Sequence, residues 1–159
     1  MIIYTIGHST RTREELLELL KQNGIKILVD VRRFPLSRKN PQFNREDFSE
    51  FLQNNGIQYF WMGEKLGGFR KGGYLSYMVS PDFETGMEEF LKLAQRGVTA
   101  VMCAEKLWFR CHRRFIATYL LNKNYPVVHI VDKKRTVRHV NLPQGNTLSP
   151  SAEANPQRQ

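Results

Sequence analysis

Thiol, imidazole, carboxylate and guanidinium groups gather in one short stretch of this sequence. Cys103 and Glu105 end an apolar run, and Cys111, His112 and Arg113 follow soon after. A thiol beside arginines or near a helix N-terminus has a lowered pKa and is more nucleophilic. Glu105 or His112 can then transfer protons. The pattern predicts nucleophilic or acid–base chemistry, with candidate catalytic residues Asp30, Cys103, Glu105 and His112.

Ligand-binding candidates lie at the ends of the expected strands. In an open parallel sheet, ligands bind beyond the carboxyl ends of the strands. Arg32 and Arg113 can hold a phosphate or carboxylate through paired hydrogen bonds. The expected binding set is His8, Ser9, Arg32, Gly67, Gly68, Arg70, Cys111 and Arg113.

Structural roles stay open for several of these residues. Asp30 can cap a loop or pair with an arginine, and His8 can belong to a turn. Cys103 can act as a small core hydrophobe. The Gly67-Gly68 pair can serve a tight turn alone. His129, inside an expected strand, is interpreted as a hydrogen-bonded core residue.

Two better-known chemistries fit less well. The cysteine-x5-arginine loop of phosphatases is not matched, because Phe109 is the sixth residue after Cys103, although residues 28–32 resemble the early strand of rhodanese-like domains. Zinc binding is a lesser alternative, because seven residues separate the two cysteines, unlike the short spacing of structural zinc sites. Its ligands would come from Cys103, Cys111, His112, His8 and His129. We therefore expect no metal and no cofactor.

The elements that must position these residues alternate along the chain. Apolar runs predict strands at residues 2–6, 25–31, 57–61, 98–103 and 127–131, with a short edge strand at 136–140. Amphipathic segments predict a helix after residues 10–12 and helices at 44–55, 81–95 and 110–122. Residues 32–43 and 63–73 are expected to be loops. This order predicts an α/β fold with a mostly parallel, three-layer, Rossmann-like sheet of about five strands and helices on both faces.

Composition indicates one ordinary globular domain. Hydrophobic residues make up 41% of 159 residues, and no run approaches a membrane span. The N-terminus lacks the features of a signal peptide, so we expect a cytoplasmic protein with no membrane partner. Residues 1–140 are expected to form the domain, and the polar residues 141–159 a disordered tail.

The formal net charge of +9 favours anionic partners. Aromatic residues stand among the basic ones and can stack on bases: Phe43, Phe60, Trp61, Phe69, Tyr74, Tyr77, Trp108 and Phe109. A nucleic acid (DNA or RNA) or a nucleotide is the expected ligand. A solvated basic surface with aromatics in the core is the alternative.

Six sequence blocks also carry a family resemblance. They lie at residues 4–9, 28–32 with Pro35, 66–68 with Arg70, 102–105, 111–113 and 128–130. In this order they resemble the signature blocks of the DUF488 family. The resemblance implies a small α/β domain with a shared pocket, and it implies no particular reaction.

Together these observations predict an enzyme or enzyme-like domain that binds an anionic ligand in a basic pocket. A non-catalytic nucleic-acid-binding module is one alternative. A redox sensor that uses Cys103 and Cys111 is another.

Overall fold

Six strands form one mixed sheet in the computed structural model, which describes residues 1–141. The tail expected at 141–159 lies outside the described residues, apart from Asn141. The strands are β1 (Ile3–Gly7), β2 (Ile27–Asp30), β3 (Gln58–Trp61), β4 (Thr99–Cys103), β5 (Val127–Asp132) and β6 (Arg135–Arg138). Their order is β3-β2-β4-β1-β5-β6. β6 lies at one edge and is the one antiparallel strand of this sheet, so the edge strand expected at 136–140 is confirmed, although it covers Arg135–Arg138.

The main helices are α1 (Arg13–Gln22), α2 (Arg45–Asn54), α5 (Pro81–Ala94) and α6 (Arg113–Asn122). A capping box of Thr12 and Glu15 begins α1, which satisfies two backbone N–H groups. Residues 63–73, expected to be a loop, contain the short helix α3 (Gly63–Leu66), and α4 (Tyr74–Tyr77) follows. The four-residue helix α3 is too short for its periodicity to be recognised in the sequence.

The helix expected at 110–122 begins instead at Arg113. Trp108–Arg110 form a separate 3-10 turn, η2, and Cys111 has extended backbone angles (φ −138°, ψ 175°). A residue with extended backbone angles cannot continue a helix, so the helical conformation is interrupted between η2 and α6. This break leaves Cys111 just before the first turn of α6.

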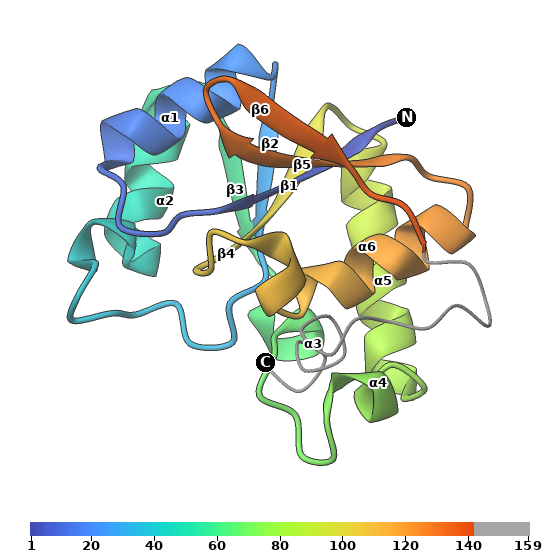
Figure 1. Cartoon of the computed structure of the whole chain (residues 1–159). Coiled ribbons are helices and arrows are strands. Elements are labelled where there is room, and N and C mark those ends of the chain that lie inside the picture. The colour runs from blue at the N-terminus through green and yellow to red at the C-terminus, as the bar shows by residue number, and fades with distance from the viewer. Residues whose placement is uncertain (142–159) are drawn as a thin grey trace.

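Helices cover both faces of the sheet, as the alternating elements predict. Leu16, Leu20, Phe48 and Leu52 from α1 and α2 pack in one apolar layer. A second layer contains apolar residues of α5 and α6. In Figure 1, α1 and α2 lie on one side of the sheet and α5 and α6 on the other. The three-layer α/β prediction is confirmed, with a sixth strand.

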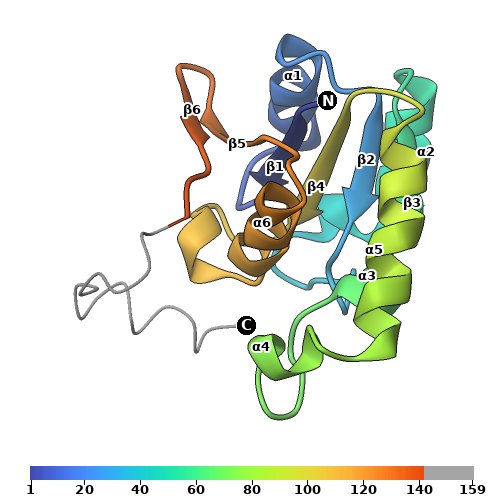
Figure 2. The same cartoon turned by 90° about the vertical axis from the view of Figure 1, so that its right-hand side faces the viewer.

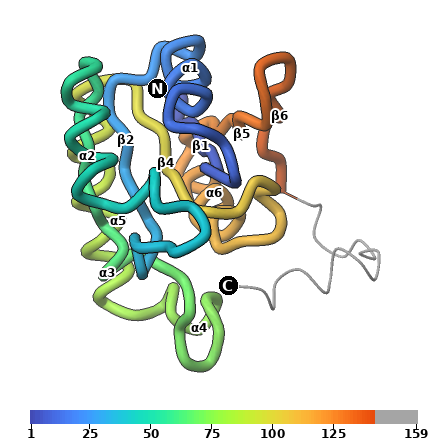
Figure 3. Tube along the Cα trace, turned by 90° about the vertical axis from the view of Figure 1, so that its left-hand side faces the viewer, coloured from blue at the N-terminus to red at the C-terminus, as the bar shows by residue number. Residues whose placement is uncertain are grey.

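The strand order leaves space for a ligand beyond the carboxyl ends of the central strands. β4 lies between β1 and β2. The chain leaves β1 and β2 toward the face with α1 and α2, whereas it leaves β4 toward the face with α6 (Figures 2 and 3). Such a reversal spreads the loops apart beyond the carboxyl ends of the strands. No helix among residues 1–141 is long and apolar enough to cross a membrane.

Candidate active site

A cavity of about 560 Å³ lies beyond the carboxyl ends of β1, β2 and β4. Seven of the predicted site residues line it: His8, Arg32, Gly68, Cys103, Glu105, Cys111 and His112. The strand-end rule therefore brings together most of the set expected from the sequence. The other five predicted residues, Ser9, Asp30, Gly67, Arg70 and Arg113, lie outside its lining.

The loops after β1 and β4 are bonded to each other. The backbone N–H of His8 donates to the carbonyl of Cys103 at 2.9 Å, and that of Ser9 donates to the carbonyl of Ala104 at 2.9 Å. A Cβ atom at Gly7 would lie 1.8 Å from the carbonyl oxygen of Glu105. Only glycine permits this approach, which brings His8 and Cys103 to the same cavity.

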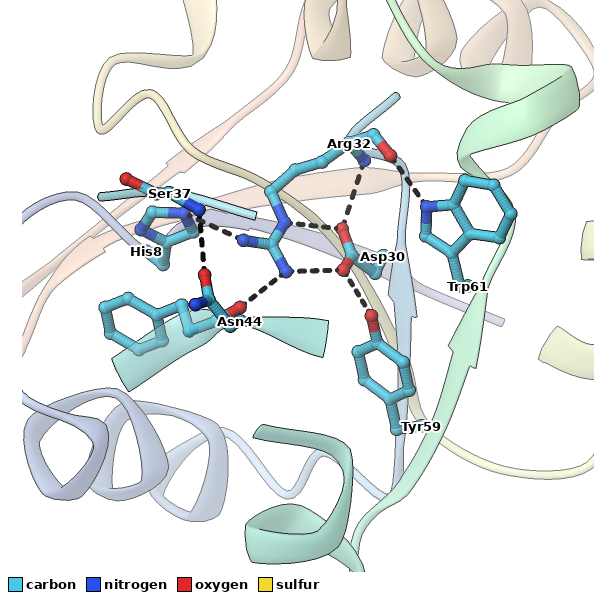
Figure 4. A network of polar contacts seen from close by, with 8 residues as sticks. His8, Asp30, Arg32, Ser37, Asn44, Tyr59 and Trp61 are labelled. Atoms are coloured by element: carbon cyan, nitrogen blue, oxygen red, sulfur yellow. Dashed lines mark hydrogen bonds and ion pairs between the residues drawn. The ribbon is translucent and has the colours of Figure 1, made fainter. Parts of the chain in front are cut away.

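Asp30 and Arg32 form a buried ion pair beside the cavity, with 0% and 6% of their side chains exposed. The guanidinium donates to both carboxylate oxygens of Asp30, from Nε at 2.9 Å and from NH2 at 2.7 Å. The hydroxyl of Tyr59 donates to the same carboxylate (Figure 4). Burial next to this carboxylate raises the pKa of Tyr59, so the phenol keeps its proton.

This pairing determines what Asp30 and Arg32 can do. Within residues 1–141, the Asp30 carboxylate accepts hydrogen bonds from Arg32 and Tyr59 alone. The arginine also donates to the carbonyl of Phe43 at 2.8 Å. The structure therefore favours the alternative in which Asp30 pairs with an arginine. Arg32 itself still lines the cavity, and its NH1 group contacts His8.

His8 is the neighbour of that NH1 group, with 3.4 Å between NH1 and Nε2. Its Nδ1–H donates to the carbonyl of Ser9 at 2.8 Å, and its ring stacks on Phe43. Because the ring is buried, the pKa of His8 falls to about 4. The neutral ring therefore accepts at Nε2 and helps to orient Arg32.

The two thiols are in contact in the cavity wall. The Sγ atoms of Cys103 and Cys111 lie 3.1 Å apart, and both cysteines are free. Cys111 Sγ also accepts N–H bonds from the backbone and the Nε of Arg113, each at 3.3 Å. The backbone N–H belongs to the first residue of α6, where the helix dipole favours negative charge.

Arg113 is 0% exposed, and it is not among the ion pairs found in residues 1–141. Its guanidinium donates to the Glu105 carbonyl at 2.6 Å and to Thr5 Oγ1 at 3.1 Å. A buried cation requires a compensating negative charge. The sulfur of Cys111 is the acidic group that contacts it.

The two thiols consequently differ in acidity. Burial raises the pKa of Cys103 well above its usual value, and its bond to Cys111 acts in the same direction. Although burial also opposes ionisation of Cys111, the hydrogen bond from Cys103 and the charge of Arg113 lower the pKa of Cys111 well below its usual value. Of the two thiols, Cys111 is therefore the one whose ionised form is favoured.

A chain of hydrogen bonds continues from Arg113 into the core. Thr5 Oγ1 lies 2.6 Å from His129 Nδ1, and His129 Nε2 lies 3.0 Å from His139 Nδ1. Burial lowers the pKa of His129 to about 2 and that of His139 to about 4, so both rings are neutral. The interpretation of His129 as a hydrogen-bonded core residue is confirmed.

His112 and Glu105 are the remaining acid–base candidates in the lining. The Nε2–H of His112 donates to the carbonyl of Val31 at 3.1 Å, which leaves the other nitrogen unprotonated in the neutral ring. Burial lowers the pKa of His112 and keeps it neutral. The Glu105 carboxylate is half-buried and accepts the backbone N–H of Lys106.

Arg70, Gly67 and Ser9 have other surroundings. Arg70 donates to the carbonyl of Gly67 at 2.9 Å and lies over the ring of Tyr77. A Cβ atom at Gly67 would lie 2.3 Å from the Gly63 carbonyl, so this glycine permits close packing. Ser9 lines a separate surface groove.

Four further side chains of the lining can bind a ligand but were not among the predicted site residues: Arg33, Phe34, Phe69 and Arg110. Of these, Phe69 was expected only as a stacking aromatic. The two arginines adjoin the predicted residues Arg32 and Cys111. The rings of Phe34 and Phe69 are 65% and 66% exposed, with centroids 6.0 Å apart. By contrast, Phe43 and Tyr74, expected among the stacking aromatics, lie in the core.

Among residues 1–141, no group of three or more His, Cys, Asp or Glu side chains is placed to hold a metal ion. Cys103 and Cys111 contact each other and Arg113, while His129 bonds to Thr5 and His139. Four of the five alternative zinc ligands thus line the cavity without forming such a group, and His129 lies outside the lining.

Fold and site together define an α/β protein with a paired-thiol cavity at its strand ends. The chain belongs to the family described as "Domain of unknown function DUF488", whose model matches residues 12–120. The family expected from the sequence blocks is thus confirmed. No curated protein and no solved structure matches the chain significantly.

Proposed function

We propose that this protein is a thiol-dependent enzyme that acts on an anionic ligand held in the cavity, with Cys111 as the nucleophile. The contact between Cys111 and Arg113 carries this proposal, because it stabilises a thiolate in the cavity wall. Of the two cysteines, only Cys103 is among the catalytic residues expected from the sequence. The opposite shifts of the two thiol pKa values favour Cys111, with Cys103 as its hydrogen-bond donor.

The cavity offers positive charge to a ligand. Arg33 and Arg110 line it, and neither forms an ion pair within residues 1–141. Glu105 is the one carboxylate in the lining. Free guanidinium groups bind phosphate or carboxylate oxygens in pairs. An anionic group of the ligand would therefore sit between Arg33 and Arg110.

The mouth of the cavity favours a flat, apolar group beside that anion. The exposed rings of Phe34 and Phe69 lie at the same lining as the two arginines. Stacking on aromatic rings together with contacts from basic residues is how proteins hold single-stranded nucleic acids. A nucleotide, free or within a single strand, combines both features and is the ligand class that we favour.

His112 and Glu105 would supply proton transfer. The neutral ring of His112 has an unprotonated nitrogen, which suits a general base. Glu105 stands at a more exposed position in the lining, where it can exchange protons with water. We assign no catalytic role to Asp30, because Arg32 and Tyr59 occupy its carboxylate.

Binding is tested by titrating labelled single-stranded DNA and RNA, a nucleoside monophosphate and inorganic phosphate into the protein at low and high salt. We expect the affinity to fall as the salt concentration rises. We also expect it to be at least tenfold lower in Arg33→Ala and in Arg110→Ala. Arg96→Ala is the matched control, since Arg96 lies outside this cavity. Salt-dependent binding that ignores both cavity variants would instead support a non-catalytic nucleic-acid-binding surface.

Alkylation locates the nucleophile. Iodoacetamide should modify Cys111 faster than Cys103, and a saturating nucleotide should slow that reaction. Faster modification of Cys103, or no protection by a bound nucleotide, would contradict the proposed roles.

A further inference from the structure

We propose a further activity, in which Cys111 and Cys103 form a redox pair that reduces hydroperoxides and closes to an intramolecular disulfide. The two Sγ atoms already lie 3.1 Å apart. A disulfide has an S–S distance of about 2.05 Å, so the atoms must approach by roughly 1 Å. This inference is independent of which ligand the cavity binds.

The geometry assigns different tasks to the two sulfurs. Cys111 Sγ accepts the backbone N–H and the Nε–H of Arg113, which stabilise it as the attacking thiolate. Cys103 Sγ contacts Cys111 and, more weakly, the carbonyl of Glu105 at 3.6 Å. A protonated partner next to a reactive thiolate is the arrangement of a resolving cysteine. Both residues line the cavity, which admits a small peroxide.

The reaction balances in two steps. The Cys111 thiolate attacks the terminal peroxide oxygen, the O–O bond breaks, and the leaving alkoxide takes a proton to become an alcohol. Cys111 is then a sulfenic acid. The sulfur of Cys103 attacks it, the S–S bond forms, the S–O bond breaks, and the hydroxyl leaves as water with the Cys103 proton. Two electrons pass from the sulfurs to the peroxide, and an external dithiol reductant returns them.

Arg113 also determines how easily the disulfide is reduced. Closing the disulfide removes the negative charge from Cys111 and leaves a fully buried guanidinium without it. The uncompensated charge makes the disulfide form less stable relative to the dithiol form. A pair whose reduced form is stabilised is readily reduced again. We therefore expect reversible oxidation.

The test treats the reduced full-length protein with hydrogen peroxide and counts free thiols after denaturation. We expect both thiols to disappear with a loss of the mass of two hydrogen atoms, and to return with dithiothreitol. Cys103→Ser should stop at a dimedone-reactive sulfenic acid, with the added mass of one oxygen atom. Cys111→Ser should react at least tenfold more slowly than the wild type.

Retention of both thiols in the wild type, or reaction no faster than that of Cys111→Ser, would overturn the proposal. Covalent dimers as the main product would also overturn it, because the pair is placed to close within one chain. Nucleotide binding is measured on the same reduced protein. If the thiols are not oxidised but the nucleotide binds, the redox proposal fails and the proposed ligand binding stands. If the thiols are oxidised but no nucleotide binds, the redox proposal stands and the proposed ligand is wrong.

Discussion

The Nε of the fully buried Arg113 lies 3.3 Å from Sγ of Cys111, a thiol in the cavity wall. Among residues 1–141, Arg113 forms no ion pair with a carboxylate. On the proposal that Cys111 is a thiolate, its charge balances this arginine in place of an aspartate or a glutamate. Stability and reactivity consequently depend on the same contact.

Replacing Arg113 by methionine should raise the pKa of Cys111 and slow its alkylation at pH 7 at least tenfold, because a neutral side chain no longer stabilises the thiolate. The dependence of the iodoacetamide rate on pH measures the shift. Arg113→Lys keeps the charge and should lie between the two proteins. An unchanged rate in folded Arg113→Met would show that Arg113 does not activate the thiol.

Asp30→Asn should lower the free energy of unfolding by about 3–5 kcal/mol, because it leaves the Arg32 charge buried without its partner. Tyr59→Phe removes one hydrogen bond to the same carboxylate and should cost only about 1–2 kcal/mol. Urea unfolding compares the two variants. Equal, small losses would indicate that Asp30 is not the counter-charge of Arg32.

Stability should fall as the pH drops below about 6.5. His8 and His139 have folded pKa values of about 4, and that of His129 is about 2. Between these values and the ordinary pKa of 6.5, the unfolded chain binds protons that the folded protein does not. Each such histidine contributes up to about 1.4 kcal/mol per pH unit.

Urea unfolding between pH 7 and pH 4.5 measures this slope. His139→Gln removes one of the titrating groups. It should reduce the slope of unfolding free energy against pH by up to about 1.4 kcal/mol per pH unit. Stability that does not change across this interval would mean that the three rings become protonated in the folded state.

Gly7→Ala should destabilise the protein by about 3 kcal/mol, because its Cβ would overlap the Glu105 carbonyl and force the loops after β1 and β4 apart. Gly97→Ala is the matched control, since its Cβ would meet nothing closer than 3.5 Å. It should change stability by less than about 1 kcal/mol. Thermal unfolding distinguishes them, and a harmless Gly7→Ala would mean that the two loops can separate freely.

The sheet and the common edge of the site could be predicted from local pattern. The β-branched run at 25–31 indicates a buried strand. The strand-end residues His8, Asp30 and Cys103 must come together, because parallel strands end at the same edge of the sheet. The edge strand was also recognisable. These features depend on periodicity and chain order, both of which are present in the sequence.

Pair distances could not be predicted in this way. Arginine and aspartate are residue types that usually lie at the protein surface. Only tertiary packing places Arg113 against Cys111 and Asp30 against Tyr59. His139 follows the last strand without any periodic signal, yet packing brings it 3.0 Å from His129. The proposed exchange of nucleophile from Cys103 to Cys111 has the same origin, because it depends on which sulfur accepts the hydrogen bonds of Arg113.

Trp108 lies flat against His129, with ring centroids 4.3 Å apart and an angle of 1° between the rings. It belongs to η2, within the segment that joins Cys103 to Cys111. The other of the two tryptophans, Trp61, ends the edge strand β3 and donates to the Arg32 carbonyl. In Trp61→Phe, the remaining indole emission would come from the chain segment between the two thiols alone. The protein therefore carries a built-in optical label at its sulfur pair, and time-resolved fluorescence can follow that segment without any attached dye.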